Sequence, residues 1–154
     1  MSDQISIENT KDASPTAYTP VSKSNTSTRR GPRLSCSSDV YRQLLDICNS
    51  DREHFVVFDL DARHRIIERR IVHIGTLTGV EVHPREVFRQ ALLNSAAAII
   101  IAHNHPSGDV SPSRQDLEIT SRLREVGEIL GIALLDHVIV AGDGFLSLAE
   151  RGWV

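Results

Sequence analysis

The sequence predicts a mixed α/β fold in which helices pack on both sides of a β-sheet. Two apolar segments, 97–102 and 133–141, have the length and the Ala, Ile, Leu and Val content of strands that are buried on both faces. Segments with helical spacing of apolar residues precede and separate them, and this order suits helices that cover a mixed sheet. At 154 residues, the chain has room for one compact domain.

Three segments have the periodicity of amphipathic helices. Ser38 can cap the first helix, whose apolar residues between 40 and 47 share one stripe. Pro84 and Pro112 suit the first position of the second and third helices, because that position needs no backbone N–H. Gly131 is the natural end of the third helix.

Short apolar segments between these helices predict the strands of the sheet. The first of them is rich in Phe and Val, which favour extended structure. The strand predictions are 54–60, a pair of strands across 65–74, 97–102, 133–141 and 145–148.

The first 35 residues differ in composition from the rest of the chain. They contain 7 Ser, 5 Thr and 3 Pro, with few large apolar side chains, so burial cannot offset the entropy cost of ordering them. We therefore expect a disordered Ser/Thr-rich tail over 1–35 and a folded domain over 36–154. Five basic and three acidic side chains give the tail a charge of +2, which leaves −5 for the domain from the net charge of −3.

Several classes of protein are excluded or disfavoured by composition. The longest apolar run, 96–102, is 7 residues long, whereas a membrane helix needs ~18. The N-terminus lacks the cationic start and apolar core of a signal peptide. Cys36 and Cys48 cannot form a disulfide framework, and neither belongs to a CxxC pair. The negative charge disfavours a generally basic nucleic-acid binder. We expect a cytoplasmic protein.

The most informative segment begins with His103 and His105, directly after an apolar strand. Side chains at i and i+2 of a strand point the same way, so the two imidazoles can converge on one ion. Pro106 and Gly108 favour a reversal of the chain, after which Asp116 can face the imidazole pair. Two imidazoles and one carboxylate leave a fourth zinc position open, as in catalytic sites.

Such a site also needs a base, which residue spacing alone does not identify. Glu53, at the start of the first predicted strand, is the preferred partner, but spacing does not distinguish it from Glu68 or Glu81. Asp109 is the only acidic residue between the histidine pair and Asp116. It is a rival ligand, although a Ser-Gly-Asp turn accounts for it without a metal.

The pattern of Glu53, His103, His105, Ser113 and Asp116 resembles the JAMM motif of the JAB/MPN metallohydrolases, with no departure in spacing. The surrounding sequence is similar to the RadC branch of that superfamily, and the resemblance covers 36–154. RadC-like proteins often carry an N-terminal helix-hairpin-helix region; this sequence shows none and is similar to the short, single-domain type. The segments that carry the RadC resemblance are HNHPSGDVSPSRQD at 103–116, PREV at 84–87, LDH at 135–137 and LSLAERG at 146–152.

The resemblance implies a three-layer α-β-α fold with a mixed sheet, akin to that of cytidine deaminases. It implies zinc bound by His103, His105 and Asp116. Glu53 would be the general acid/base that acts on water at the zinc, and Ser113 would donate a hydrogen bond to the oxyanion. In the superfamily the cleaved bond is an amide, often the isopeptide that joins a ubiquitin-like protein to lysine. The expected function is a zinc metallopeptidase acting on a peptide or a protein conjugate.

Three other functions compete with this one. A DNA repair or recombination accessory role is attached to the RadC name, and the cluster of Arg29, Arg30 and Arg33 would allow weak DNA contact through the tail. A nucleobase deaminase needs H-x-E and P-C-x-x-C signatures, which the sequence lacks. An inactive scaffold is disfavoured because such members lose metal ligands, whereas this chain keeps the full set. The sequence leaves the oligomeric state open.

Some site residues also have simpler structural interpretations. Ser113 and Asp116 have the spacing of a capping box, although Ser111 before Pro112 is the better predicted N-cap of the third helix. His137 belongs to a predicted buried strand, where it is either an ordinary core histidine or a residue that supports the metal ligands from behind.

Overall fold

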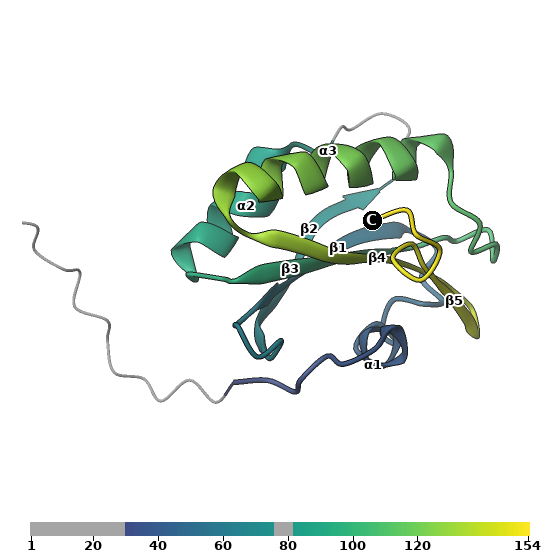
Figure 1. Ribbon diagram of the computed structural model, residues 1–154. Helices are drawn as coiled ribbons and strands as arrows, with labels where there is room; N and C mark the ends of the chain where they lie inside the picture. Colours follow the sequence, from purple (N-terminus) through teal and green to yellow (C-terminus); the bar gives the residue numbers. More distant parts are fainter. Residues whose placement is uncertain (1–29, 76–81) are drawn as a thin grey trace, which may run out of the picture.

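The computed structural model describes residues 30–75 and 82–154, which fold around one mixed five-stranded sheet (Figure 1). The strands are β1 (Glu53–Leu60), β2 (Ile66–Gly75), β3 (Ala98–Asn104), β4 (Ala133–Ala141) and β5 (Gly144–Ser147). Their order across the sheet is β2-β1-β3-β4-β5. Strands β3 and β4 run parallel, and the other neighbouring pairs run antiparallel.

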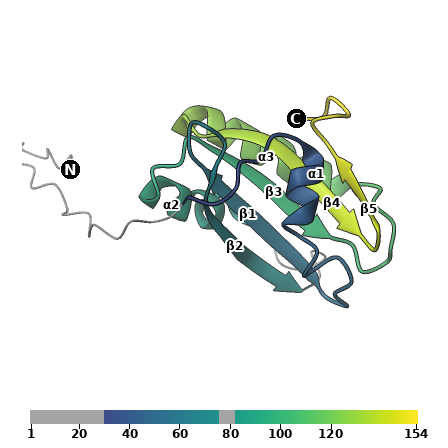
Figure 2. The same cartoon turned by 90° about the horizontal axis from the view of Figure 1, so that it is seen from below.

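Helices cover both faces of the sheet, which confirms the three-layer α-β-α arrangement. The helices are α1 (Ser37–Arg42), α2 (Pro84–Leu93) and α3 (Arg114–Leu130). α2 and α3 cover one face, and α1 lies against the other (Figures 1 and 2). In β1, Phe55 and Val57 join the core beneath α2 and α3, whereas Val56 and Phe58 join the core beneath α1. This alternation follows from the two-residue period of a strand.

The central strand β3 positions the candidate site. It lies between β1 and β4, and all seven of its residues are buried. α3 makes the crossover from β3 to the parallel strand β4, a connection that needs a helix of about this length. The carboxyl end of β3 therefore faces the amino-terminal end of α3 and delivers His103 into a buried environment.

The predicted pair of strands across 65–74 is wrong, because this segment forms the single strand β2. It pairs with β1 along its length. The hairpin turn lies earlier, where Asp61 Oδ1 accepts hydrogen bonds from the backbone N–H groups of Arg63 and Arg65, each at 2.9 Å. His64 in this turn has a φ of 59°. The aspartate side chain thus closes the turn and leaves the following residues free to extend.

The first helix is shorter than its apolar pattern predicts. α1 follows Cys36 rather than Ser38 as its N-cap, and it ends at Arg42. Beyond that point the chain continues in turns, in which Leu44 and Ile47 remain buried. Hydrogen bonds from residue i+3 back to residue i keep nearly the same side chains facing the core, so the stripe survives although the regular helix does not.

The predicted start of the third helix is also corrected. α3 begins at Arg114, and Ser113 rather than Ser111 is its N-cap. Ser113 Oγ accepts a hydrogen bond from Asp116 N–H at 3.1 Å, and Asp116 Oδ2 accepts one from Ser113 N–H at 2.7 Å. This reciprocal pair of bonds outweighs the preference of Pro112 for the first helical position. α2 does begin at a proline, as predicted.

Residues 30–34, assigned to the tail by composition, run beside the start of β2. The backbone N–H of Gly31 donates to Ile66 O at 2.8 Å, and that of Leu34 donates to His64 O at 2.9 Å. Leu34 is buried in the core beneath α1. The packed domain therefore reaches closer to the N-terminus than residue 36. Residues 1–29 of the predicted tail lie outside the described residues.

Gly127 packs α3 tightly against the turn that leads into β4. A Cβ added there would collide with the backbone oxygen of Ile132, whose N–H donates to Gly127 O at 2.9 Å. We expect Gly127→Ala to lower the free energy of unfolding by about 1–3 kcal/mol because the backbone must shift. Urea denaturation measures this loss. The neighbouring exposed change Glu128→Ala is the control, and equal stability of the two variants would contradict the packing argument.

Candidate metal centre

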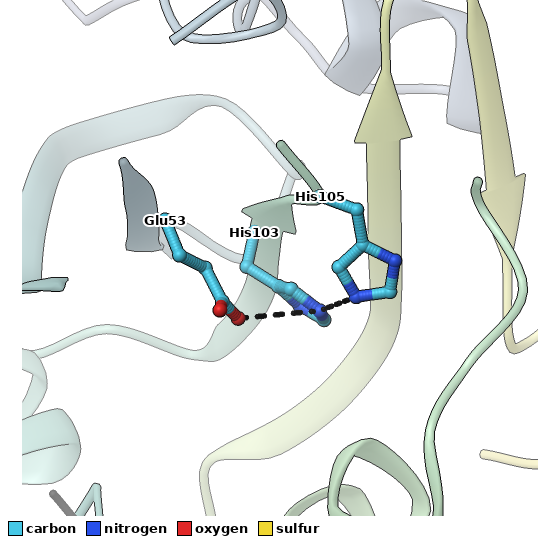
Figure 3. A group of neighbouring side chains, drawn as sticks. All are labelled: Glu53, His103 and His105. Atoms are coloured by element: carbon cyan, nitrogen blue, oxygen red, sulfur yellow. Dashed lines mark hydrogen bonds and ion pairs between the residues drawn. The ribbon is translucent and has the colours of Figure 1, made fainter. Parts of the chain in front are cut away.

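Two imidazoles meet at the carboxyl end of β3. His103 lies within β3 and is buried, and His105 follows directly after the strand. Their Nε2 atoms are 2.9 Å apart, and both rings point into the same space (Figure 3). Asn104 between them points away and holds the start of β1, where its Oδ1 accepts from His54 N–H at 2.8 Å. The i and i+2 placement predicted from the sequence is present.

Asp116 completes the group from the first turn of α3. Its Oδ1 lies 3.2 Å from His103 Nε2, and its Oδ2 lies 3.5 Å from His105 Nε2. The chain reverses through a turn in which Gly108 has a φ of 87° and donates its N–H to His105 O at 3.1 Å. Ser113 then orients the carboxylate, because its backbone N–H and its hydroxyl each donate to Asp116 Oδ2 at 2.7 Å.

The charge state of Asp116 is set by opposing influences. Burial alone would raise the pKa of this carboxyl, but the adjacent His103 and His105 rings and the hydrogen bond from Ser113 outweigh burial and hold the pKa well below its usual value. The same contact raises the pKa of His105, against the opposing effect of burial. Asp116 is therefore an anion at neutral pH, as a metal ligand must be.

Glu53 approaches from the neighbouring strand. It is the first residue of β1, which pairs with β3 in a register that places Phe55 opposite His103. Glu53 Oε1 lies 3.9 Å from His103 Nε2, and its side chain points toward the two imidazoles (Figure 3). Glu53, His103 and His105 form a cluster whose ligand atoms lie within 4.8 Å of one another. β-Sheet pairing thus brings together residues that are 50 positions apart.

The other acidic residues raised by the sequence take different places. Glu68 accepts a hydrogen bond from Asn94 Nδ2 at 2.7 Å, and Glu81 lies outside the described residues. Asp109 is exposed, and its carboxylate accepts from Ser111 N–H at 2.8 Å, so it serves the loop. Among the acidic residues that the structure describes, Glu53 and Asp116 are the two whose carboxylates lie beside His103 and His105.

The side chains of His103, His105 and Asp116, called the ligand set below, have separations close to those of ligands around one tetrahedral ion. Donors at 2.0–2.1 Å from a common zinc ion are about 3.3 Å from one another. Here the two Nε2 atoms are 2.9 Å apart, His103 Nε2 is 3.2 Å from Asp116 Oδ1, and His105 Nε2 is 3.5 Å from Asp116 Oδ2. Asp116 Oδ1 is buried and has no hydrogen-bond partner within 30–75 and 82–154. A buried carboxylate oxygen left in this state is costly unless a cation faces it.

The protonation of His105 also suits a metal ligand. Its Nδ1 lies 2.7 Å from the backbone oxygen of Asp109, which can only accept a hydrogen bond. The ring proton of neutral His105 is therefore on Nδ1, and the lone pair of Nε2 faces the ligand set. Asp109, the rival ligand in the sequence, thus orients His105 through its backbone oxygen.

Two further residues lie behind His103. His137 in β4 places its Nε2 2.8 Å from His103 Nδ1, and its own Nδ1 is 2.6 Å from Thr120 Oγ1 in α3. All three side chains are buried, and Phe55 stacks against the His103 ring with centroids 6.3 Å apart. Burial, followed by the neighbouring His103, lowers the pKa of His137, so His137 is neutral. His137 was predicted as either a core histidine or a support of the metal ligands, whereas no sequence pattern pointed to Thr120.

Fold and site together define a three-layer α/β domain with a candidate metal centre at one end of its central strands. A family profile described as RadC-like JAB domain matches residues 34–153. The chain therefore belongs to the RadC-like JAB domain family, which confirms the resemblance seen in the sequence. No helix among the described residues is long and apolar enough to cross a membrane.

Three bacterial relatives, each called a UPF0758 protein, show how far the similarity extends. The chain is 51% identical over 122 residues to the protein of Rubrobacter xylanophilus, a match that covers 79% of this chain and 53% of the relative. It is 52% identical over 125 residues to the protein of Syntrophotalea carbinolica, a match that covers 80% of this chain and 55% of the relative. It is 46% identical over 122 residues to the protein of Geobacillus thermodenitrificans, which covers 79% of this chain and 54% of the relative. The chain spans about half the length of the curated relatives it matches.

Proposed function

We propose that this protein is a zinc-dependent metallohydrolase that cleaves an amide bond in a peptide or a protein conjugate. The observation that carries the proposal is the convergence of Glu53 with the ligand set at one point, from β1, the end of β3 and the start of α3. Two neutral imidazoles and one carboxylate form the three-ligand set of a catalytic zinc site. Family membership supports the hydrolase assignment.

Each residue of the site has a distinct part in the proposed reaction. Zinc held by the ligand set would act as a Lewis acid, which polarises the amide carbonyl and acidifies water. Glu53 takes a proton from the attacking water and gives it to the nitrogen of the leaving amine. Glu53 Oε1 lies 3.9 Å from His103 Nε2, whereas Asp116 Oδ1 lies at 3.2 Å. Because Glu53 stands farther out than the ligand set, its carboxylate remains available to carry a proton.

Ser113 has two tasks in this proposal. Its backbone N–H holds Asp116 Oδ2 at 2.7 Å whatever the hydroxyl does. The hydroxyl, which donates to the same oxygen, can turn about the Cβ–Oγ bond and donate instead to the oxyanion that forms when the carbonyl is attacked. The capping role therefore supports the predicted oxyanion role and does not replace it.

The DNA-accessory alternative depends on the basic cluster of the tail. Arg29 lies outside the described residues, while Arg30 pairs with Asp61 at 4.0 Å and Arg33 forms a backbone bridge with Arg65. These contacts attach the described arginines to the β1–β2 turn. They give no specific support to DNA binding, so the amide hydrolase remains the proposed function.

The test compares zinc-loaded and metal-free wild-type protein. Elemental mass spectrometry is expected to give about one zinc per chain. A library of peptides and lysine isopeptides, incubated with both forms, should yield new amines by mass spectrometry with the zinc-loaded form alone. Failure to take up zinc at neutral pH would contradict the proposal. Salt-dependent DNA binding without any cleavage would favour the accessory role instead.

A further inference from the structure

A chain of hydrogen bonds connects the backbone of Asp116 to the ring of His103. Thr120 Oγ1 donates to Asp116 O at 2.5 Å and lies 2.6 Å from His137 Nδ1. His137 Nε2 in turn lies 2.8 Å from His103 Nδ1. Every member is buried. Water therefore does not compete for these bonds, and each proton in the chain has a defined place.

The direction of the chain follows from its end at a carbonyl. Because Asp116 O can only accept, the single hydroxyl proton of Thr120 points toward it, and Thr120 Oγ1 must accept from His137 Nδ1–H. The neutral His137 ring then has a bare Nε2, which accepts from His103 Nδ1–H. In the neutral form of His103, this leaves Nε2 without a proton, on the side that faces His105 and Asp116.

We infer that Thr120 and His137 are positioning residues, which fix the tautomer and the ring orientation of His103 so that its Nε2 is available to a metal. The inference rests on the proposed metal site. It assigns a task to a buried threonine and a buried histidine that the hydrolytic reaction itself does not use.

The geometry also couples the ligands to one another. Asp116 supplies its carboxylate to the ligand set and its carbonyl to Thr120, one helical turn further along α3. His137 stands on β4 beside β3, where it pairs with Ile101. The first turns of α3 and the end of β3 are therefore held in register by side chains as well as by the sheet. Removing the Thr120 hydroxyl breaks this connection and leaves the side chains of the ligand set unchanged.

The test uses Thr120→Val, which keeps the shape but loses the hydroxyl, beside Thr120→Ser, which keeps the hydroxyl. We expect Thr120→Val to weaken zinc affinity by about 10–100-fold, as loss of a ligand's hydrogen-bond support does in other metal sites. Thr120→Ser should remain within about 3-fold of wild type. Zinc affinity is measured by competition with a chelator. The exposed change Ser121→Ala on the same helix is the control.

A second measurement reads the tautomer directly in metal-free protein. At a pH at which the His103 ring carries one proton, nitrogen-15 NMR of the histidine side chains should find that proton on Nδ1 in wild type and Thr120→Ser, and a mixture of tautomers in Thr120→Val. A neutral His103 ring whose single proton is on Nε2 in the wild type overturns the inference. Equal zinc affinity of folded Thr120→Val and Thr120→Ser also overturns it.

The two measurements separate this inference from the proposed function. A wild-type protein that binds no zinc refutes the hydrolase proposal. The tautomer of metal-free His103 still decides whether Thr120 and His137 position the ring, because it is read without any metal.

Discussion

Replacing Glu53 by glutamine is expected to leave zinc bound and to slow amide cleavage by about 10²–10⁴-fold, the usual contribution of a general acid/base. The glutamine amide has nearly the same shape as the carboxylate but cannot take the proton from water. Zinc content should be retained because His103, His105 and Asp116 are unchanged. Turnover of a substrate found in the library, together with zinc per chain, measures both parts of the prediction.

The matched control for this variant is Glu68→Gln. Glu68 is an alternative that residue spacing left open, and it lies on β2, where it accepts from Asn94 Nδ2. A glutamine there keeps an oxygen acceptor, so we expect turnover close to that of wild type. If Glu53→Gln cleaves as fast as wild type, Glu53 is not the base, and the reaction needs a different proton carrier.

The order of the layers was predictable because the spacing of apolar residues indicates which elements are helices, which are strands and which faces are buried. In β3, unbroken burial matches the apolar run, and in β1, alternate side chains enter the two cores. Element ends were harder to predict because they depend on competing local bonds. Pro112 favours one start for α3, but the two reciprocal bonds between Ser113 and Asp116 produce another. The single strand at β2 likewise depends on the turn closed by Asp61.

The same distinction applies to the site: residues close together in the sequence could be predicted from their spacing, whereas distant ones could not. His103 and His105 share a face because of strand geometry, so their spacing was enough to predict them. Glu53 is 50 residues from His103, and spacing did not distinguish it from Glu68. The JAMM resemblance did, and the β1–β3 pairing shows the physical cause. Thr120 carried no signal in the sequence, because its importance arises only where α3 packs against β4.

Zinc is expected to stabilise the fold, and loss of a ligand is expected to abolish that stabilisation. At a zinc concentration of 100 times Kd, binding adds about 2.7 kcal/mol to the free energy of unfolding, which raises Tm by about 10 °C for a domain of this size. The physical source is the buried Asp116 Oδ1, which has no hydrogen-bond partner among the described residues. Calorimetry with and without zinc should show this rise for wild type and none for His105→Ala or Asp116→Ala.

The control for the ligand variants is Asp109→Ala, from the same loop. Its carboxylate bonds to Ser111 N–H, while its carbonyl, which the substitution keeps, accepts from His105 Nδ1. Asp109→Ala should therefore respond to zinc as wild type does. A normal response in Asp116→Ala, joined with a lost response in Asp109→Ala, would make Asp109 the third ligand. The capping bonds between Ser113 and Asp116 would then be the whole role of Asp116. Its buried Oδ1, which has no hydrogen-bond partner within 30–75 and 82–154, would need another explanation.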